Sequence, residues 1–251
     1  MEMRVSEMVA EIYEEKGLLH LSDEVLFGDS VTLLEDLGEV LRVKTREGVV
    51  GYTRAEGVSV GSRDPEAFFV AYRADVLKEP DVTAEKMFIL PRFSRVTVVG
   101  RSGDFWCVDL SQNERGYVHL HHLVSPPKIE ASAESGVSTA LSLLGVPYRY
   151  GGRSAVALDC SGLVSLAFAF HGIILPRNTA EMRTLPEVEP RRCRRGDLIL
   201  FDSHVGIALT RTTFLHASAS MGFVAVSSLE KSHPLFDSVH VPQGYTVRRV
   251  L

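Results

Sequence analysis

The sequence predicts an α+β protein in which two small β-barrels precede a third domain built from helices and strands. Three observations predict this class: an internal repeat of alternating strands, a pair of consecutive prolines after it, and a long apolar helix in the second half. The chain has 251 residues, so two or three domains are expected. Its composition, with 45% apolar and 24% charged residues, is ordinary for a globular protein.

The internal repeat is offset by 65 residues (from residue 31 to residue 96) and continues without a gap. In each copy, two strands alternate apolar and polar residues with period two, as half-buried strands do, and a turn of glycine and an acidic residue joins them. The matched positions include Val31 and Val96, Gly38 and Gly103, Leu41 and Trp106, and Gly51-Tyr52 and Gly116-Tyr117. Short strands at this spacing predict two small β-barrels; the alternative is two structural β-units that bind no ligand.

Consecutive prolines at positions 126 and 127 mark a linker after the second repeat, because proline interrupts both helices and β-ladders. The composition then changes to residues that favour a helix, which is predicted over 130–144 with Gly145 at its end. The predicted domains are 1–62 and 63–127 for the two β-barrels, and 128–251 for the third domain.

Cys160 is the candidate nucleophile of the third domain. It is expected in the first turn of a buried apolar helix, with Asp159 as the N-cap. Free N–H groups and the helix dipole stabilise an anion at that position, so a lowered thiol pKa is expected there. The same N–H groups can hold the oxyanion of a tetrahedral intermediate. A cysteine that only packs would be expected within an apolar helix face, whereas Cys160 lies between Asp159 and Ser161.

Two histidines on predicted neighbouring strands supply the base that such a nucleophile requires. His204 opens one strand, and His216 lies inside the next. Either histidine alone would be interpreted as an ordinary strand residue. Together, beside a cysteine at a helix start, they indicate a base and the residue that orients it, although the register of the two strands does not follow from the sequence.

The motifs of the third domain resemble those of the NlpC/P60 family of cell-wall cysteine peptidases. Asp-Cys-Ser-Gly follows Pro-Tyr-x-Tyr-Gly-Gly and precedes Arg-Gly-Asp-Leu, His-Val-Gly-Ile and Phe-Leu-His-Ala, and the match covers about residues 135–230. The repeat in front resembles a tandem pair of bacterial SH3-like domains. Nearly the whole chain is thus similar to the γ-D-glutamyl-L-diamino-acid endopeptidases, which have a papain-like core and cut the stem peptides of peptidoglycan.

This resemblance implies a role for each matching residue. Cys160 becomes the nucleophile, His204 the general base and His216 the residue that orients it, while Tyr148 lies near the nucleophile and assists at the oxyanion. The substrate-binding residues that the resemblance implies are Tyr150, Asp159, Ser161, Asn178 and Thr179. No metal or organic cofactor is required, and the expected ligands are peptidoglycan stem peptides or muropeptides.

Two positions depart from the family pattern at the subsite for the free N-terminal ammonium of the substrate. Asn178 follows a Pro-Arg pair where aspartate is usual, and Val49 stands where a tyrosine of the first SH3-like domain is usual. Asparagine accepts a hydrogen bond but carries no charge, and valine does neither. We therefore expect altered recognition of the substrate N-terminus beside an intact catalytic centre.

The remaining features limit the other functions. A net charge of −5 without a long Lys/Arg run gives no case for nucleic-acid binding, and no apolar stretch is long enough to insert in a membrane. The N-terminus lacks a signal-peptide pattern, so a cytoplasmic location is expected. Cys193, among arginines, is expected to be a surface or loop cysteine. Two alternatives remain: a catalytically silent protein that binds cell-wall fragments, and an amidase or acyltransferase that uses the same cysteine.

Overall fold

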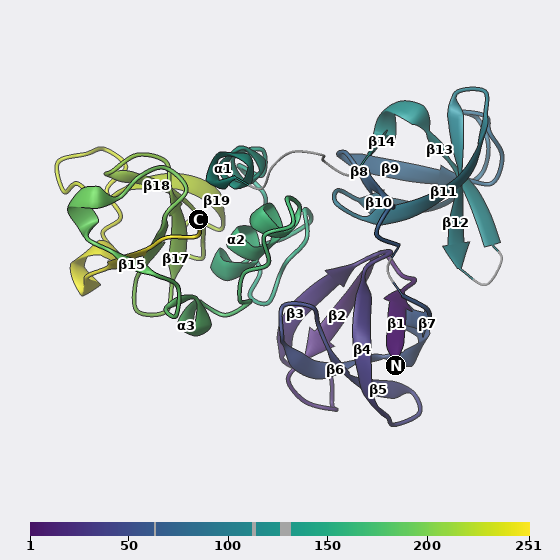
Figure 1. The fold of residues 1–251 in the computed structure, drawn as a ribbon, viewed down its shortest axis with the longest axis horizontal. Helices are drawn as coiled ribbons and strands as arrows, with labels where there is room; N and C mark the ends of the chain where they lie inside the picture. The colour runs from purple at the N-terminus through teal and green to yellow at the C-terminus, as the bar shows by residue number, and fades with distance from the viewer. Residues whose placement is uncertain (63, 112–113, 126–131) are drawn as a thin grey trace. The chain divides into compact units, whose positions relative to one another are not determined.

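The computed structural model describes residues 1–62, 64–111, 114–125 and 132–251, which form two compact units (Figure 1). The contacts divide the chain into Met1–Lys128 and Ile129–Leu251. The N-terminal unit contains two antiparallel β-sheets, and the C-terminal unit is α+β. The predicted proline linker lies outside the described residues. None of the helices in the described part of the chain has the length and hydropathy of a membrane-spanning segment.

The first sheet has seven strands in the order β3-β2-β6-β5-β4-β1-β7. The second sheet repeats this order as β10-β9-β13-β12-β11-β8-β14. The strands of the first sheet are β1 (Glu2–Val5), β2 (Val9–Tyr13), β3 (Leu21–Leu26), β4 (Ser30–Asp36), β5 (Val40–Lys44), β6 (Val50–Arg54) and β7 (Val58–Val60). Those of the second are β8 (Phe68–Val70), β9 (Arg73–Leu77), β10 (Lys86–Pro91), β11 (Arg95–Ser102), β12 (Phe105–Ser111), β13 (Glu114–His119) and β14 (Leu123–Val124).

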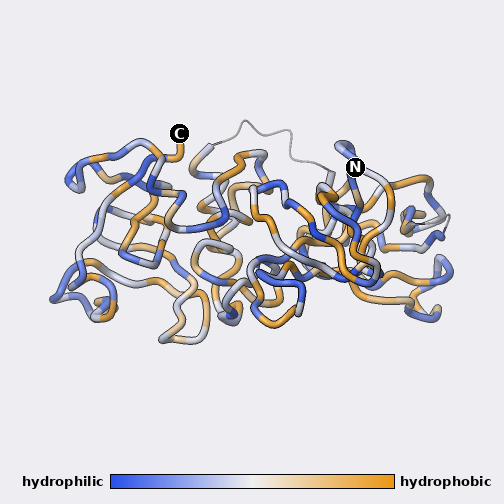
Figure 2. The backbone as a smooth tube through the Cα atoms, turned by 90° about the horizontal axis from the view of Figure 1, so that it is seen from below, coloured by the Kyte–Doolittle hydropathy of each residue, from blue (hydrophilic) through white to orange (hydrophobic). Residues whose placement is uncertain are grey.

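The repeat in the sequence is confirmed as a structural duplication. The register of β4 with β5 shifts between Leu33 and Glu35, and that of β11 with β12 shifts between Val98 and Gly100, which are the matched positions of the repeat. A β-bulge at the same place in both copies indicates that the two sheets bend in the same way. Figure 2 shows hydrophobic and hydrophilic stretches interspersed along the backbone.

Each sheet closes around its own hydrophobic core. Val43, from β5, is fully buried in the first core, and its counterpart Val108, from β12, is fully buried in the second. Phe27 follows β3 in the chain but packs in the core of the second sheet, so the two sheets of this unit are in direct contact. Val49 is only 9% exposed and belongs to the first core. Its side chain therefore has a packing role and is not available to a ligand.

The C-terminal unit combines three helices with a six-stranded sheet of order β15-β20-β16-β17-β18-β19 (Figure 1). The helices are α1 (Ala133–Leu141), α2 (Cys160–Ala169) and α3 (Thr179–Met182). The strands are β15 (Glu187–Val188), β16 (Leu198–Leu200), β17 (Val205–Ala208), β18 (Thr213–Ser218), β19 (Phe223–Ser228) and β20 (Thr246–Arg248). The helix α1 is shorter than predicted, because the chain turns after Leu141 toward Gly145, whose φ is +81°.

The helix α2 lies between α1 and the sheet, and this position explains its sequence. Every residue from Cys160 to Phe168 is buried, as expected for a helix that is apolar on all sides. The ring of Phe168 packs against Gly136 of α1. A Cβ atom added at Gly136 would be only 2.5 Å from this ring, so a larger residue does not fit there. On its other side α2 contacts β17 and β18. The start of the helix is thereby brought to the strands that carry the two histidines.

Candidate active site

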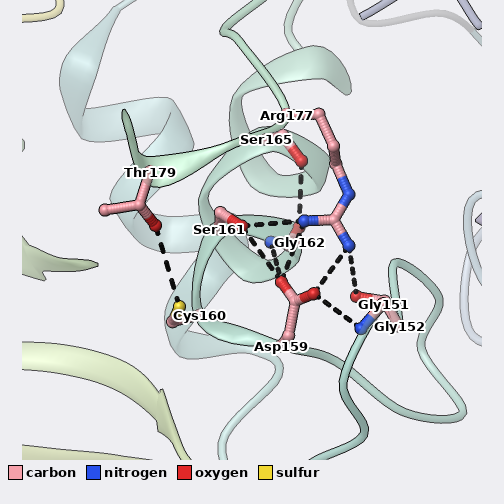
Figure 3. Close-up of polar contacts among 9 residues, drawn as sticks. All are labelled: Gly151, Gly152, Asp159, Cys160, Ser161, Gly162, Ser165, Arg177 and Thr179. Carbon is pink, nitrogen blue, oxygen red and sulfur yellow. Dashed lines mark hydrogen bonds and ion pairs between the residues drawn. The ribbon is translucent and has the colours of Figure 1, made fainter. Parts of the chain in front are cut away.

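The N-terminus of α2 is fixed by the carboxylate of Asp159, which acts as the predicted N-cap (Figure 3). Its Oδ1 accepts a hydrogen bond from the Gly162 N–H at 2.6 Å, and its Oδ2 accepts one from the Gly151 N–H at 2.9 Å. One carboxylate thus joins the first turn of the helix to the loop that precedes it. Because both groups are buried backbone donors, this cap satisfies N–H groups that would otherwise lack partners.

Arg177 holds the same carboxylate from the other side (Figure 3). Its Nη1 lies 3.0 Å from Oδ1 of Asp159 and its Nη2 lies 2.7 Å from Oδ2, which is the paired geometry of a strong arginine–carboxylate contact. Nη1 also donates to Ser161 Oγ at 2.8 Å. Arg177 is 1% exposed, and Asp159 and Ser161 are each 6% exposed. Asp159 and Ser161, predicted to bind substrate, are therefore buried and engaged in this internal network.

A close approach of two glycines completes this framework. A Cβ atom at Gly162 would lie 2.1 Å from the carbonyl oxygen of Gly152, so no larger residue fits there without moving the loop. The Asp159 N–H donates to that same carbonyl at 3.0 Å. The glycine of the Asp-Cys-Ser-Gly motif is therefore required by packing between the helix and its preceding loop.

The sulfur of Cys160 is nearly buried and faces α3 and β17. Thr179 Oγ1 lies 4.0 Å from Sγ, and the N–H groups of Val205 and Ser161 are hydrogen-bonded to it. Burial, followed by the charge of Asp159, raises the pKa of the Cys160 thiol, and these hydrogen bonds only partly oppose the increase. The expected lowering of this pKa at the helix start was therefore wrong, because desolvation outweighs the local donors.

His204 and His216 come together as the sequence suggested. Nε2 of His204 lies 2.7 Å from Nδ1 of His216, and Nε2 of His216 lies 3.0 Å from Ser227 Oγ. The register of β17 with β18 produces this contact: Ile207 pairs with Leu215, so the histidines stand near each other on adjoining strands. His204 directly precedes Val205, whose N–H reaches Sγ of Cys160. Nδ1 of His204 is the nitrogen left to serve the thiol.

Both imidazoles are neutral at neutral pH. Burial lowers the pKa of His204 to about 3, and the charges of His216 and His240 add to the effect. Burial also lowers the pKa of His216 to about 4. The resting site therefore contains a neutral base beside a protonated thiol. A proton transfer from sulfur to His204 is needed to form the thiolate.

The tyrosines and the residues of α3 occupy different surroundings. Burial, together with the charge of Cys160, raises the pKa of Tyr148 to about 12, so its hydroxyl stays a hydrogen-bond donor at neutral pH. Tyr150 is 68% exposed. Asn178 is exposed at the N-cap of α3 and makes no side-chain capping bond, which leaves its amide free of that role. Thr179 is the predicted substrate residue that the structure places against the nucleophile.

His204, His216 and His240 are the one group in the described ranges whose ligand atoms are placed to share a metal ion, all within 4.8 Å of one another. Both nitrogens of His216 and Nδ1 of His240 already have hydrogen-bond partners. The rings of His204 and His240 are stacked 4.0 Å apart at 12°. Nitrogen lone pairs lie in the ring plane, so stacked parallel rings do not direct them at one ion. The geometry favours a hydrogen-bonded set.

Several residues of this site were not found from the sequence. Arg177 belongs to a recognised Pro-Arg pair, yet its bond to Asp159 depends on the path of the loop between α2 and α3. Ser227 and His240 approach the histidines only through strand pairing and the segment after β19. Cys193, expected at the surface or in a loop, does lie outside the helices and strands, but it is only 9% exposed in a hydrophobic cluster, and burial raises its pKa to about 11.

Replacement of Arg177 by glutamine is expected to destabilise the C-terminal unit by about 3–5 kcal/mol, because it leaves the Asp159 carboxylate buried without its cation. The double variant Asp159→Asn/Arg177→Gln should be less destabilised than the sum of the two single variants. Urea unfolding followed by circular dichroism measures each free energy. Arg195→Gln, which breaks an exposed pair with Glu134, is the control and should cost less than about 1 kcal/mol. Additive effects would contradict this interpretation.

Acidification is expected to destabilise the C-terminal unit between about pH 6.5 and pH 4. In this window the unfolded chain binds protons at His204 and His216, whereas the lowered pKa values keep the folded imidazoles neutral. Stability therefore rises with pH, by roughly 2 kcal/mol or more from pH 5 to pH 7. Hydrogen exchange of the β18 amides, corrected for intrinsic rates, measures it. His216→Gln should reduce the pH dependence of stability, whereas His20→Gln, at an exposed histidine, should not. An equal change of stability with pH in the unaltered protein and both variants would contradict this expectation.

Comparison with known proteins supports the same chemistry. A family model described as NlpC/P60 family matches residues 145–241. Over 249 residues the chain is 34% identical to dipeptidyl-peptidase 6 of Lysinibacillus sphaericus, covering 91% of this chain and 92% of that protein. Over 96 residues it is 40% identical to the murein DD-endopeptidase MepS/murein LD-carboxypeptidase of Escherichia coli K12, covering 36% of this chain and 50% of that protein.

The fold is shared over the full length with a solved structure. The crystal structure of an NlpC/P60 family protein from Bacillus cereus superposes with a TM-score of 0.84 and covers 100% of both chains, at 17% sequence identity. The identity to dipeptidyl-peptidase 6 extends through the two N-terminal sheets as well as the unit that carries Cys160. The chain therefore belongs to the NlpC/P60 family and is a cysteine peptidase.

Proposed function

We propose that this peptidase hydrolyses the γ-D-glutamyl–L-diamino-acid bond of peptidoglycan stem peptides or muropeptides. The observation that carries the proposal is the hydrogen-bonded series His204–His216–Ser227, which begins beside the Val205 N–H that contacts Cys160 Sγ. The full-length relative is named a dipeptidyl-peptidase, and the shorter match is named a murein endopeptidase and carboxypeptidase. The specific bond follows from the resemblance of the tandem sheets plus peptidase unit to the γ-D-glutamyl-L-diamino-acid endopeptidases.

The first half of the reaction acylates the enzyme. Nδ1 of His204 accepts the proton of Cys160 as Sγ attacks the γ-carbonyl carbon of D-glutamate. Because the thiol pKa is raised and the imidazole pKa is lowered, this proton transfer accompanies the attack instead of preceding it. Backbone N–H groups in the first turn of α2 and the protonated hydroxyl of Tyr148 stabilise the oxyanion. The C–N bond then breaks, and His204 gives its proton to the leaving amine.

The second half releases the product. His204 removes a proton from water, which attacks the thioester carbonyl. The C–S bond breaks, the carboxyl product leaves, and the proton returns from His204 to Sγ of Cys160. His216 remains neutral throughout and keeps the His204 ring in place through the 2.7 Å contact between their nitrogens.

The subsite for the substrate N-terminus is proposed to lack its usual charge. Asn178 is the exposed N-cap of α3 and directly precedes Thr179, whose hydroxyl lies 4.0 Å from the sulfur of Cys160. A carboxylate there would bind an ammonium more strongly than an amide does, by roughly 1 kcal/mol. The loss of this charge supports a weaker requirement for a free N-terminal amine.

The proposed specificity is tested by identifying the bond that is cut. Incubation with L-Ala-γ-D-Glu-diaminopimelate-D-Ala is expected to give L-Ala-D-Glu and the diaminopimelate fragment, detected by mass spectrometry. Cys160→Ala should reduce this rate by roughly 10³-fold or more and leave binding intact. Cys193→Ala, at a buried cysteine outside the site, should keep the activity. Cleavage at another bond would contradict the assigned specificity, and binding without cleavage by the unaltered protein would indicate a silent binding protein.

The second prediction concerns the substrate N-terminus. The unaltered enzyme should cleave matched peptides with free and acetylated N-termini at similar kcat/KM, whereas Asn178→Asp should favour the free amine by about fivefold to tenfold. Asn178→Ala serves as the uncharged control and should not gain this preference. A strong preference for the free amine in the unaltered enzyme would show that another group binds the ammonium.

A further inference from the structure

The segment after β19 contains a buried aspartate–histidine pair that the mechanism above does not use. Asp237 Oδ2 lies 2.8 Å from Nδ1 of His240, and Asp237 Oδ1 accepts hydrogen bonds from the N–H groups of Val239 and His240, each at 3.0 Å. The Asp237 N–H in turn donates to the carbonyl of Ser228, at the end of β19, at 3.0 Å. The side chain of Asp237 is 6% exposed and that of His240 is 16% exposed. The pair is thus rigidly attached to the sheet that carries the catalytic histidines.

The ring of His240 covers one face of the His204 ring. The two centroids are 4.0 Å apart and the planes are inclined by only 12°. Phe201 packs beside both rings, at 6.0 Å from His204 and 5.5 Å from His240. His216 meets the edge of His204 at 80°. With one edge bonded to His216 and one face covered by His240, the His204 ring has little freedom to rotate.

The pair also lies near a positive charge that forms on His204 during the reaction. When His204 takes the proton of Cys160, it becomes an imidazolium in a buried site, and its hydrogen-bond partner His216 is neutral. The groups whose charges act on His204 are His216 from β18, and His240 and Asp237 from the segment after β19. Asp159 acts on Cys160 and is paired with Arg177. The charge of Asp237 raises the pKa of both His204 and His216, whereas burial and the charge of His240 lower the pKa of both. The effect of His240 on His204 is larger than that of Asp237, so the Asp237 carboxylate only partly opposes the decrease.

We propose that Asp237 and His240 form a positioning pair for the general base: His240 fixes the plane of the His204 ring, and Asp237 offsets the positive charge that His204 acquires during attack. This inference rests on the proposed peptidase reaction and extends it by a charged component behind the Cys160–His204–His216 set. His240 and Asp237 touch no substrate in this scheme and act through His204 alone.

The role of the Asp237 charge is tested by Asp237→Asn, which keeps the shape of the side chain and can still accept the two backbone hydrogen bonds. The active enzyme shares one proton between Cys160 and His204, so removal of a nearby negative charge makes that proton easier to lose and a second proton harder to gain. Both limbs of the kcat/KM–pH profile should therefore move to lower pH, by roughly half a unit or more. Asp197→Asn, at another buried aspartate of the same unit, should leave the profile in place. Unchanged limbs in Asp237→Asn would overturn the proposal.

The ring is tested by a pair of variants at His240. His240→Ala should lower kcat by roughly tenfold with little change in KM, because the general base loses its orientation. His240→Phe restores a planar face and should recover most of this loss. If Asp237→Asn does not fold, as judged by circular dichroism, the two His240 variants alone test the proposed positioning role. Equal activity of His240→Ala and the unaltered enzyme, or no recovery in His240→Phe, would overturn the positioning role.

Alkylation of Cys160 separates this inference from the proposed substrate. The rate of its reaction with iodoacetamide at neutral pH depends on transfer of the thiol proton to His204 and needs no peptide. Peptide mapping distinguishes Cys160 from Cys107 and Cys193. Asp237→Asn should move the pH dependence of this alkylation to lower pH, as it moves the kcat/KM profile, even if no muropeptide is cleaved, in which case the proposed function fails and the positioning pair stands. An unchanged pH dependence of alkylation in a protein that does cleave muropeptides would refute the role of Asp237 and leave the proposed function in place.

Discussion

The buried contact between Arg177 and Asp159 is the constraint on which the site depends. Asp159 caps the helix that begins at Cys160, and Arg177 neutralises the carboxylate where water cannot. A carboxylate left unpaired at this depth would destabilise the unit and would raise the pKa of the neighbouring thiol further. The same contact draws the segment of α3 toward α2, where Thr179 meets the sulfur. One ion pair thus positions the nucleophile, its loop and one wall of the site.

The catalytic groups are arranged for chemistry that starts from neutral partners. Burial raises the pKa of the Cys160 thiol and lowers that of the His204 imidazole, so the charged pair forms only as the sulfur attacks. Such a site must stabilise each charge at the moment it develops. The N–H groups near Cys160 stabilise the charge on the sulfur and the oxyanion, and the proposed Asp237–His240 pair acts on the imidazolium. Around this centre, the exposed Asn178 is proposed to offer an uncharged contact to the substrate N-terminus.

The sequence was informative wherever chemistry depends on neighbours along the chain. The repeat predicted the tandem sheets, and the structure adds β-bulges at matched positions of the two copies. Asp159 was correctly placed as the cap of α2. Contacts that depend on the path of loops could not be predicted: the Arg177 bond, the stacking of His240, and the core position of Cys193. The direction of the Cys160 pKa also failed, because a helix start is visible in a sequence whereas the depth of burial is not.

The central claim is that Cys160 carries the γ-D-glutamyl product as a thioester. Intact-protein mass spectrometry of the enzyme, acid-quenched during turnover of L-Ala-γ-D-Glu-diaminopimelate-D-Ala, tests it directly. We expect an added mass equal to the L-Ala-D-Glu acyl group, located at Cys160 by peptide mapping and absent from Cys160→Ala. An adduct of a different fragment, an adduct at Cys193 or Cys107, or turnover without any adduct on a rapid time scale would contradict the account.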